Sequence, residues 1–118
     1  MRYVSAYDDR LEYLIRFSYG YVDAYQIRNV KDRMVIPAKQ VLAKGVTPNL
    51  ITCEILVGNR NAKEEEMTIV SKGMSLRTPC DKLVKEIGRK IALTRALQNA
   101  NWHKEARAQA WAEYFNRH

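Results

Sequence analysis

TPCDKLVKEIGRKIALTRALQ, residues 78–98, is the stretch that decides the fold, because it is the clearest helix in the chain. Thr78 is placed to act as the N-cap, and Pro79 then takes the first helical position, where a missing N–H has no cost. Asp81 adds a capping-box-like acid near the positive end of the helix dipole. Apolar residues at spacings of three and four form a stripe of helical period, which we expect to face the core. The stripe comprises Cys80, Leu83, Val84, Ile87, Ile91 and Leu97.

A second helix is predicted from Trp102 to Asn116, because Asn99–Asn101 is typical of a helix stop and a new cap. The two helices would form a helical hairpin. One face of the second helix mixes cations with aromatic rings: Lys104, Arg107, Ala108, Trp111, Tyr114 and Phe115. Such rings can stack on bases while the cations meet phosphates. Aromatic stripes more often pack against a core or another subunit, and we favour that interpretation.

Gly88 is out of place in the middle of the first helix, where a glycine costs ~1 kcal/mol relative to alanine. On a helical wheel it lies near Ala92, with Arg95 and Asn99 on the same flank. Small residues there allow a close approach to the backbone. The approaching element is either another helix or strand, which we favour, or a ligand that Arg95 and Asn99 would contact.

The first 76 residues read mostly as β structure. Within residues 10–30, aromatic and aliphatic side chains alternate with others from Leu11 to Tyr19, which favours a strand, although a helix fits almost as well. Residues 37–44 predict a short helix, with a proline at its first position and a glycine just after its end.

A β-hairpin is predicted next. Leu50–Val57, LITCEILV, is a strong strand signal, and the polar segment Gly58–Glu66 reads as the hairpin loop. Met67–Lys72 returns as the second strand, and Ser71–Gly73 is expected to break it.

We therefore expect one α+β domain over residues 1–118, with an antiparallel β-hairpin or small sheet followed by a C-terminal two-helix hairpin. Residues 1–76 would be mostly β with the short helix at 37–44, and residues 77–118 would form the helical hairpin.

The charge of the chain is +7, and its excess lies in the helical hairpin. Residues 77–118 carry nine Lys and Arg against four Asp and Glu, whereas residues 1–76 carry eleven against nine. A basic surface of this kind suits phosphates, nucleic acid or an acidic protein surface, but it also serves solubility alone.

Two cysteines without CxxC spacing, Cys53 and Cys80, indicate a reduced intracellular protein. No apolar run approaches the ~20 residues of a membrane span, and the N-terminus lacks the apolar region of a signal peptide. We expect a cytoplasmic protein that does not contact a membrane.

No catalytic signature is present. The sequence lacks a Walker loop, a G-x-G-x-x-G, an HExxH and a CxxC pair, so no metal, cofactor or standard phosphate loop is predicted. The two histidines are His103 and the terminal His118, and nothing in the sequence places either beside a cysteine. We expect a protein that is not an enzyme.

The segment from Met67 to the C-terminus resembles a group of small proteins common in phage genomes. In these, a strand leads through a polar turn into a helix of the form D-x-F-x(n)-G-R-x-I-A-x-x-R-A-L, followed by a second charged helix. The matching residues are Asp81, Leu83 in the aromatic position, Gly88, Arg89, Ile91, Ala92, Arg95, Ala96 and Leu97. The match covers less than half of the chain.

This segment is most similar to the Thoeris anti-defence family, phage proteins that oligomerise and sequester cyclic ADP-ribose-type and cyclic oligonucleotide immune signals. The resemblance implies binding without turnover, in the host cytoplasm and in pockets between subunits of a homo-oligomer. The expected ligand-binding residues are Arg77, Gly88, Arg95, Asn99, Arg107 and Trp111. The arginines would hold phosphates, the asparagine would hydrogen-bond ribose or base, and the tryptophan or a tyrosine would stack.

Two other functions fit the same basic hairpin. One is a phage inhibitor that binds a host defence protein, such as a protein–nucleic acid effector in the manner of an anti-CRISPR protein. The other is direct binding of DNA or RNA, which would depend on backbone charge because the sequence has no RNP motif or zinc finger.

Overall fold

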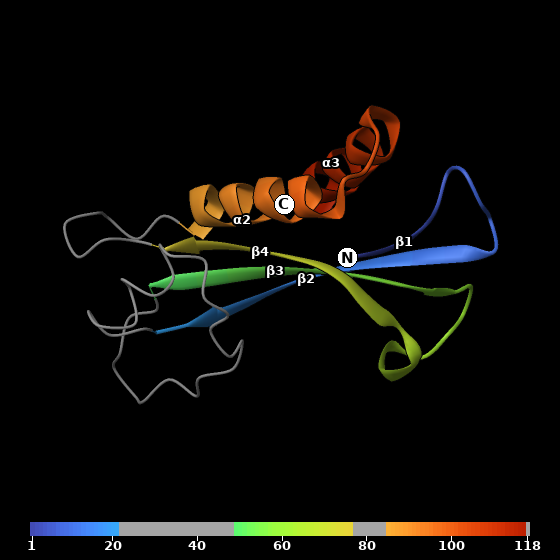
Figure 1. Cartoon of the computed structure of the whole chain (residues 1–118), viewed down its shortest axis with the longest axis horizontal. Helices are drawn as coiled ribbons and strands as arrows, with labels where there is room; N and C mark the ends of the chain where they lie inside the picture. The colour runs from blue at the N-terminus through green and yellow to red at the C-terminus, as the bar shows by residue number, and fades with distance from the viewer. Residues whose placement is uncertain (22–48, 77–84, 118) are drawn as a thin grey trace.

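The computed structural model describes residues 1–21, 49–76 and 85–117, which form a four-stranded antiparallel sheet and two C-terminal helices (Figure 1). The fold is α+β, as the sequence predicts. The strands pair in the order β1-β2-β3-β4, so that β1 and β4 are the edges. The elements are β1 (Arg2–Val4), β2 (Leu11–Gly20), β3 (Leu50–Asn59), the 3-10 helix η1 (Glu64–Glu66), β4 (Thr68–Leu76), α2 (Lys85–Ala100) and α3 (Lys104–Arg117).

Both helices lie over the same face of the sheet, with α2 on β4 and β3 (Figure 1). Pairing of Ile15 with Ile55, and of Cys53 with Gly73, places these residues on the face that the helices cover. Ile15, Cys53 and Ile55 have no exposed surface, and they pack with apolar residues of both helices. The helical members of this core are Ala92, Leu93, Ala96, Leu97, Ala110 and Tyr114.

The four strands extend the sequence prediction. The alternating pattern of residues 11–19 does form a strand, β2, and the remainder of the ambiguous segment lies outside the described residues, as does the short helix expected at 37–44. β3 continues two residues past Val57. The hairpin loop includes η1 and Asn61, whose φ of 66° is the left-handed conformation that asparagine tolerates.

The break expected at Ser71–Gly73 is wrong, because β4 runs through it to Leu76. A bulge lies earlier, where Val70 is the extra residue between the Ile55–Ser71 and Leu56–Ile69 pairs. Gly73 is needed for packing: a Cβ there would overlap the backbone of α2 at Ala92 and Ala96. A glycine inside a strand thus marks a close backbone approach rather than a turn.

The apolar stripe expected on the first helix is also wrong for two residues. Ile87 is 56% exposed and Ile91 is 38% exposed. The side that packs on the sheet carries smaller residues, Ala92 and Ala96, since the helix backbone lies so near Gly73. The expected cap at Thr78–Asp81 and the stripe residues before Lys85 lie outside the described residues.

The break between the helices is confirmed. Asn101 has a φ of 56° and follows the last residue of α2. α3 begins two residues after the expected start, because His103 caps it: His103 Nδ1 accepts the backbone N–H of Ala106 at 3.2 Å.

Side chains of α2 hydrogen-bond the outer edge of the sheet at β4. Arg95 Nη1 donates to the carbonyl of Met74 at 2.6 Å, and Asn99 Nδ2 donates to the carbonyl of Lys72 at 2.8 Å. An edge strand otherwise presents such carbonyls to any passing strand. α2 therefore both covers the core and occupies acceptors of this edge.

α3 does the same for the opposite edge, β1. Gln109 Nε2 donates to the carbonyl of Val4 at 2.9 Å, and its Oε1 accepts the backbone N–H of Ala6 at 3.0 Å. Arg117 Nη2 donates to the carbonyl of Arg2 at 3.1 Å. Each edge strand is thus tied to its own helix by polar side chains.

Within the described part of the chain, neither helix is long and apolar enough to cross a membrane.

Candidate anion-binding site

Arg89, on the face of α2 that points toward α3 and β2, is held by two phenol groups. Its Nη1 donates to the Tyr19 hydroxyl at 3.3 Å and its Nε donates to the Tyr114 hydroxyl at 3.5 Å. Both distances exceed the usual 2.7–3.2 Å of such bonds, so the guanidinium is oriented but only weakly engaged. The hydroxyls of Tyr19 and then Tyr114 raise the pKa of Arg89, which stays charged.

No carboxylate among residues 1–21, 49–76 and 85–117 forms an ion pair with Arg89 or with Lys85. Lys85 lies one helical turn before Arg89, and its Nζ is 5.2 Å from the centre of the Tyr19 ring. Two cations that have no acidic partner among these residues therefore meet at one tyrosine. We call Tyr19, Lys85, Arg89 and Tyr114 the Arg89 site.

Packed rings fix one wall of the Arg89 site. Tyr114 is 1% exposed, and its ring contacts Phe17 of β2 at 6.0 Å and Trp111 at 5.8 Å, both edge to face. Trp111 also stacks on Phe115, with 26° between the ring planes. Because these rings pack against one another, they fix the position of the Tyr114 hydroxyl, which accepts from Arg89.

Lys90 borders this wall. Its Nζ lies 5.6 Å from the centre of the Phe115 ring and 3.2 Å from the Glu86 carboxylate. This cation is therefore partly neutralised by Glu86.

The chemistry of the Arg89 site is attraction of an anion. Guanidinium, ammonium and phenol groups donate hydrogen bonds, and the guanidinium and ammonium groups also carry positive charge. Cys53 is fully buried in the sheet, and burial raises the pKa of its thiol to about 12. No three His, Cys, Asp or Glu side chains of the described residues gather into a set that could hold a metal ion.

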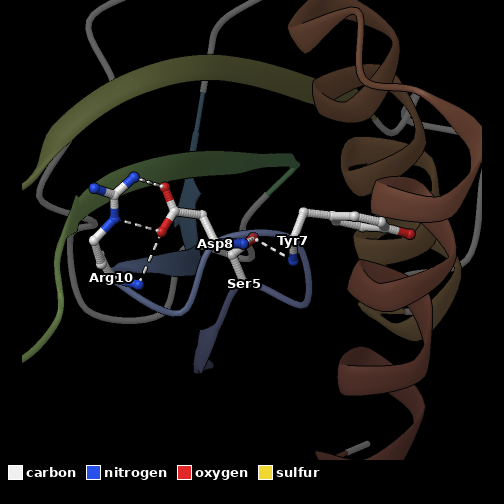
Figure 2. A network of polar contacts seen from close by, with 4 residues as sticks. All are labelled: Ser5, Tyr7, Asp8 and Arg10. Carbon is white, nitrogen blue, oxygen red and sulfur yellow. Dashed lines mark hydrogen bonds and ion pairs between the residues drawn. The ribbon is translucent and has the colours of Figure 1, made fainter.

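A second charged hollow lies at the tips of the two hairpins and is lined by Asp9, Arg10, Asn59 and Arg60. One of its two arginines is already paired within the β1–β2 turn: Arg10 Nε and Nη2 donate to Asp8 at 3.0 and 3.1 Å (Figure 2). In the same turn, Ser5 Oγ accepts the backbone N–H groups of Tyr7 and Asp8. Arg10 is therefore held by Asp8, whereas the Arg89 site brings two cations to one tyrosine, and the Arg89 site is the better candidate.

The residues expected to bind ligand do not share one surface. Arg95 and Asn99 lie together on the β4 flank of α2, where they bond strand carbonyls. Gly88 faces the sheet, and a Cβ there would overlap Ile51, which is the packing role favoured from the sequence. Arg77 lies outside the described residues.

Trp111 and Arg107 are on α3. Trp111 is the one expected residue that lies at the wall of the Arg89 site, through Tyr114. Arg107 is exposed one turn before it.

Sequence reasoning missed the pairing of Tyr19 with Arg89 because the two are seventy residues apart. The available signal was the Lys85–Arg89 spacing of one helical turn beside a tyrosine-rich strand. No family model, curated protein or solved structure matches this chain. The functional conclusion therefore depends on geometry and on the resemblance of the C-terminal segment.

Proposed function

We propose that the protein binds a small phosphate-bearing nucleotide at the Arg89 site and retains it without turnover. The observation that carries the proposal is a guanidinium held by two long phenol contacts with no carboxylate partner among the described residues. A phosphate can replace these weak contacts with two short, charge-assisted hydrogen bonds, because the arginine fork matches its oxygens.

Lys85 and the neighbouring aromatic rings supply further groups that suit a nucleotide. Lys85 adds a second positive charge over Tyr19, so that an incoming phosphate meets two cations at once. Trp111 offers aromatic surface beside Tyr114, and base–aromatic stacking contributes ~1–3 kcal/mol per base. A ligand that combines phosphate with a base would use both features.

The class of nucleotide follows from the resemblance to the Thoeris anti-defence family. On this proposal the ligand is a cyclic ADP-ribose-type or cyclic oligonucleotide immune signal, and the protein acts by lowering its free concentration in the host cytoplasm.

Calorimetric titration with cyclic ADP-ribose isomers and cyclic di- and trinucleotides tests the proposal. Replacing Arg89 by alanine should lower the affinity for the tightest-binding ligand by about tenfold to a hundredfold, the range for a hydrogen bond to a charged group. Arg89→Lys keeps the charge but loses the planar fork, so its affinity should fall between those of the unaltered protein and Arg89→Ala. Ligand recovered from the complex should be chemically unchanged by chromatography.

Arg60→Ala is the matched control, since it removes an exposed arginine at the end of β3 far from Tyr19. It should leave the affinity unchanged. Absence of heat with every nucleotide, or equal loss in the Arg60 and Arg89 variants, would contradict the proposal.

A further inference from the structure

Three large apolar side chains are exposed on the outer surface of the two helices. Ile87 is 56%, Ile91 is 38% and Phe115 is 58% exposed. Ile87 and Ile91 lie one helical turn apart, on the side of α2 opposite the alanines that meet the sheet. Exposed apolar side chains that gather on one surface indicate docking, whereas scattered ones need no explanation.

Lys90 joins the apolar residues of the two helices into one surface. It follows Ile87 by three residues, so the two lie on the same side of α2, and its ammonium group lies 5.6 Å from the centre of the Phe115 ring. We call Ile87, Lys90, Ile91 and Phe115 the outer helical patch.

The two helices that carry the outer helical patch have a positive net charge, because residues 85–117 carry seven Lys and Arg but three Glu. Some of these cations lie elsewhere: Lys85 and Arg89 belong to the Arg89 site, and Arg95 bonds the Met74 carbonyl. The exposed cations Lys104 and Arg107 of α3 are in no ion pair among the described residues.

This combination decides between occupants. A second copy of the chain would bring these like charges together, which is unfavourable. A nucleic acid strand would satisfy the cations but would leave the aliphatic side chains of Ile87 and Ile91 without a stacking partner. An amphipathic helix satisfies both features, because its apolar side covers the isoleucines while acidic residues at its flanks face the lysines and arginines.

We propose that the outer helical patch docks an acidic amphipathic helix of a partner protein. Ile87, Ile91 and Phe115 contact the apolar stripe of that helix, and Lys104 and Arg107 face its carboxylates. The proposal goes beyond nucleotide binding and does not require it, since Tyr19, Lys85, Arg89 and Tyr114 take no part.

The test uses the full chain and synthetic peptides of about 18 residues, long enough to form a helix when bound. The first peptide carries leucines at helical spacing and glutamates elsewhere. The second has the same composition without the stripe, and the third replaces glutamate by lysine. Affinity is measured by calorimetry, and the isoleucine methyl groups are followed by NMR.

The first peptide should bind and shift the methyl signals of Ile87 and Ile91. The scrambled peptide should bind at least about tenfold more weakly, and the lysine peptide should not bind. The double variant Ile87→Ser, Ile91→Ser should lose about tenfold or more in affinity while keeping its melting temperature, because both side chains are exposed. Val70→Ser, at an apolar residue of β4 that is 43% exposed, is the control and should bind normally.

Several results would overturn the inference. Equal affinity for the ordered and scrambled acidic peptides would mean that charge alone acts. A concentration-dependent mass with shifts of the same methyl groups on dilution would assign the patch to a second copy, and competition by an oligothymidine strand would assign it to nucleic acid. The two proposals are tested separately. Arg89→Ala should still bind the peptide, and the double isoleucine variant should still bind the nucleotide.

Discussion

The carboxylate of Glu12 is nearly buried on β2 and depends on two neighbours. The backbone N–H of Asn61 donates to its Oε1 at 2.7 Å, and Arg2 Nε donates to its Oε2 at 2.6 Å. The Asn61 hydrogen bond and then the Arg2 hydrogen bond lower the pKa of Glu12 below its ordinary 4.5. This single side chain thereby joins the start of β2 to the β3–β4 loop.

The sign of the resulting pH dependence follows from linkage. Because the pKa of Glu12 is lower in the folded state, its stabilisation is fully present above pH 4.5 and is lost as the pH falls through the lowered value. Glu12→Gln should therefore destabilise the protein at neutral pH and flatten the acid side of its stability curve. Urea unfolding between pH 7 and pH 3 measures this.

Asp9→Asn, at an exposed carboxylate of the neighbouring turn, is the control for Glu12→Gln. The acid side of its curve of stability against pH should resemble that of the unaltered protein. A Glu12→Gln curve parallel to that of the unaltered protein at all pH values would contradict the assignment.

At the scale of elements, the contact between α2 and β4 depends on the absence of a side chain at Gly73. A Cβ there would overlap backbone atoms of Ala92 and Ala96, which cannot rotate away as a side chain can. Gly73→Ala should lower the free energy of unfolding by about 2–3 kcal/mol, the upper part of the usual range for overpacking. Denaturant titration followed by circular dichroism measures the change.

Gly20→Ala is the matched control, because a Cβ at Gly20 would lie 4.0 Å from Leu50, an ordinary contact. It should change the stability little. If Gly73→Ala were as mild as Gly20→Ala, α2 would not lie as close to β4 as described.

The elements also show what the sequence could predict and why. Period-two alternation identified β2, a dense apolar run identified β3, and asparagines between two helical segments located the α2–α3 break. The break expected at Gly73 was wrong because a glycine beside a serine and a lysine is typical of a turn. The packing of α2 on Gly73, which explains a glycine inside the strand, cannot be read from the sequence. Ile87 and Ile91 were expected in the core because they belong to a stripe of helical period. The period identifies the stripe, but it does not show which side of the helix packs on the sheet.

The candidate site was harder to predict than the fold. Its members come from β2, α2 and α3, and no local pattern pairs Tyr19 with Arg89 or Tyr114. Arg95 and Asn99 looked like ligand contacts because they lie on one flank of a helix, but that flank lies along the open side of β4. Polar side chains on a helix flank are equally suited to both tasks.

At the scale of the whole molecule, Cys53 reports on opening of the core, because it lies between the sheet and the helices with no exposed surface. Its thiol has a pKa of about 12 through burial, and only the thiolate reacts readily. In a Cys80→Ser variant, labelling by a disulfide reagent should be slow and limited by global unfolding. The rate is read from reagent absorbance over increasing urea.

The same variant in full denaturant gives the reference rate and should label completely at one site. Fast labelling of the folded protein, without dependence on urea, would show that the core opens locally around β3.

The hydrogen bonds from Arg95, Asn99, Gln109 and Arg117 to the outermost strands set how this molecule can meet others. Four main-chain carbonyls at these two margins are already in use, so a neighbouring chain that approaches as a fifth strand finds fewer free acceptors there. Where these carbonyls are occupied, contacts with another molecule are expected to depend on side-chain charge and shape more than on added backbone pairing.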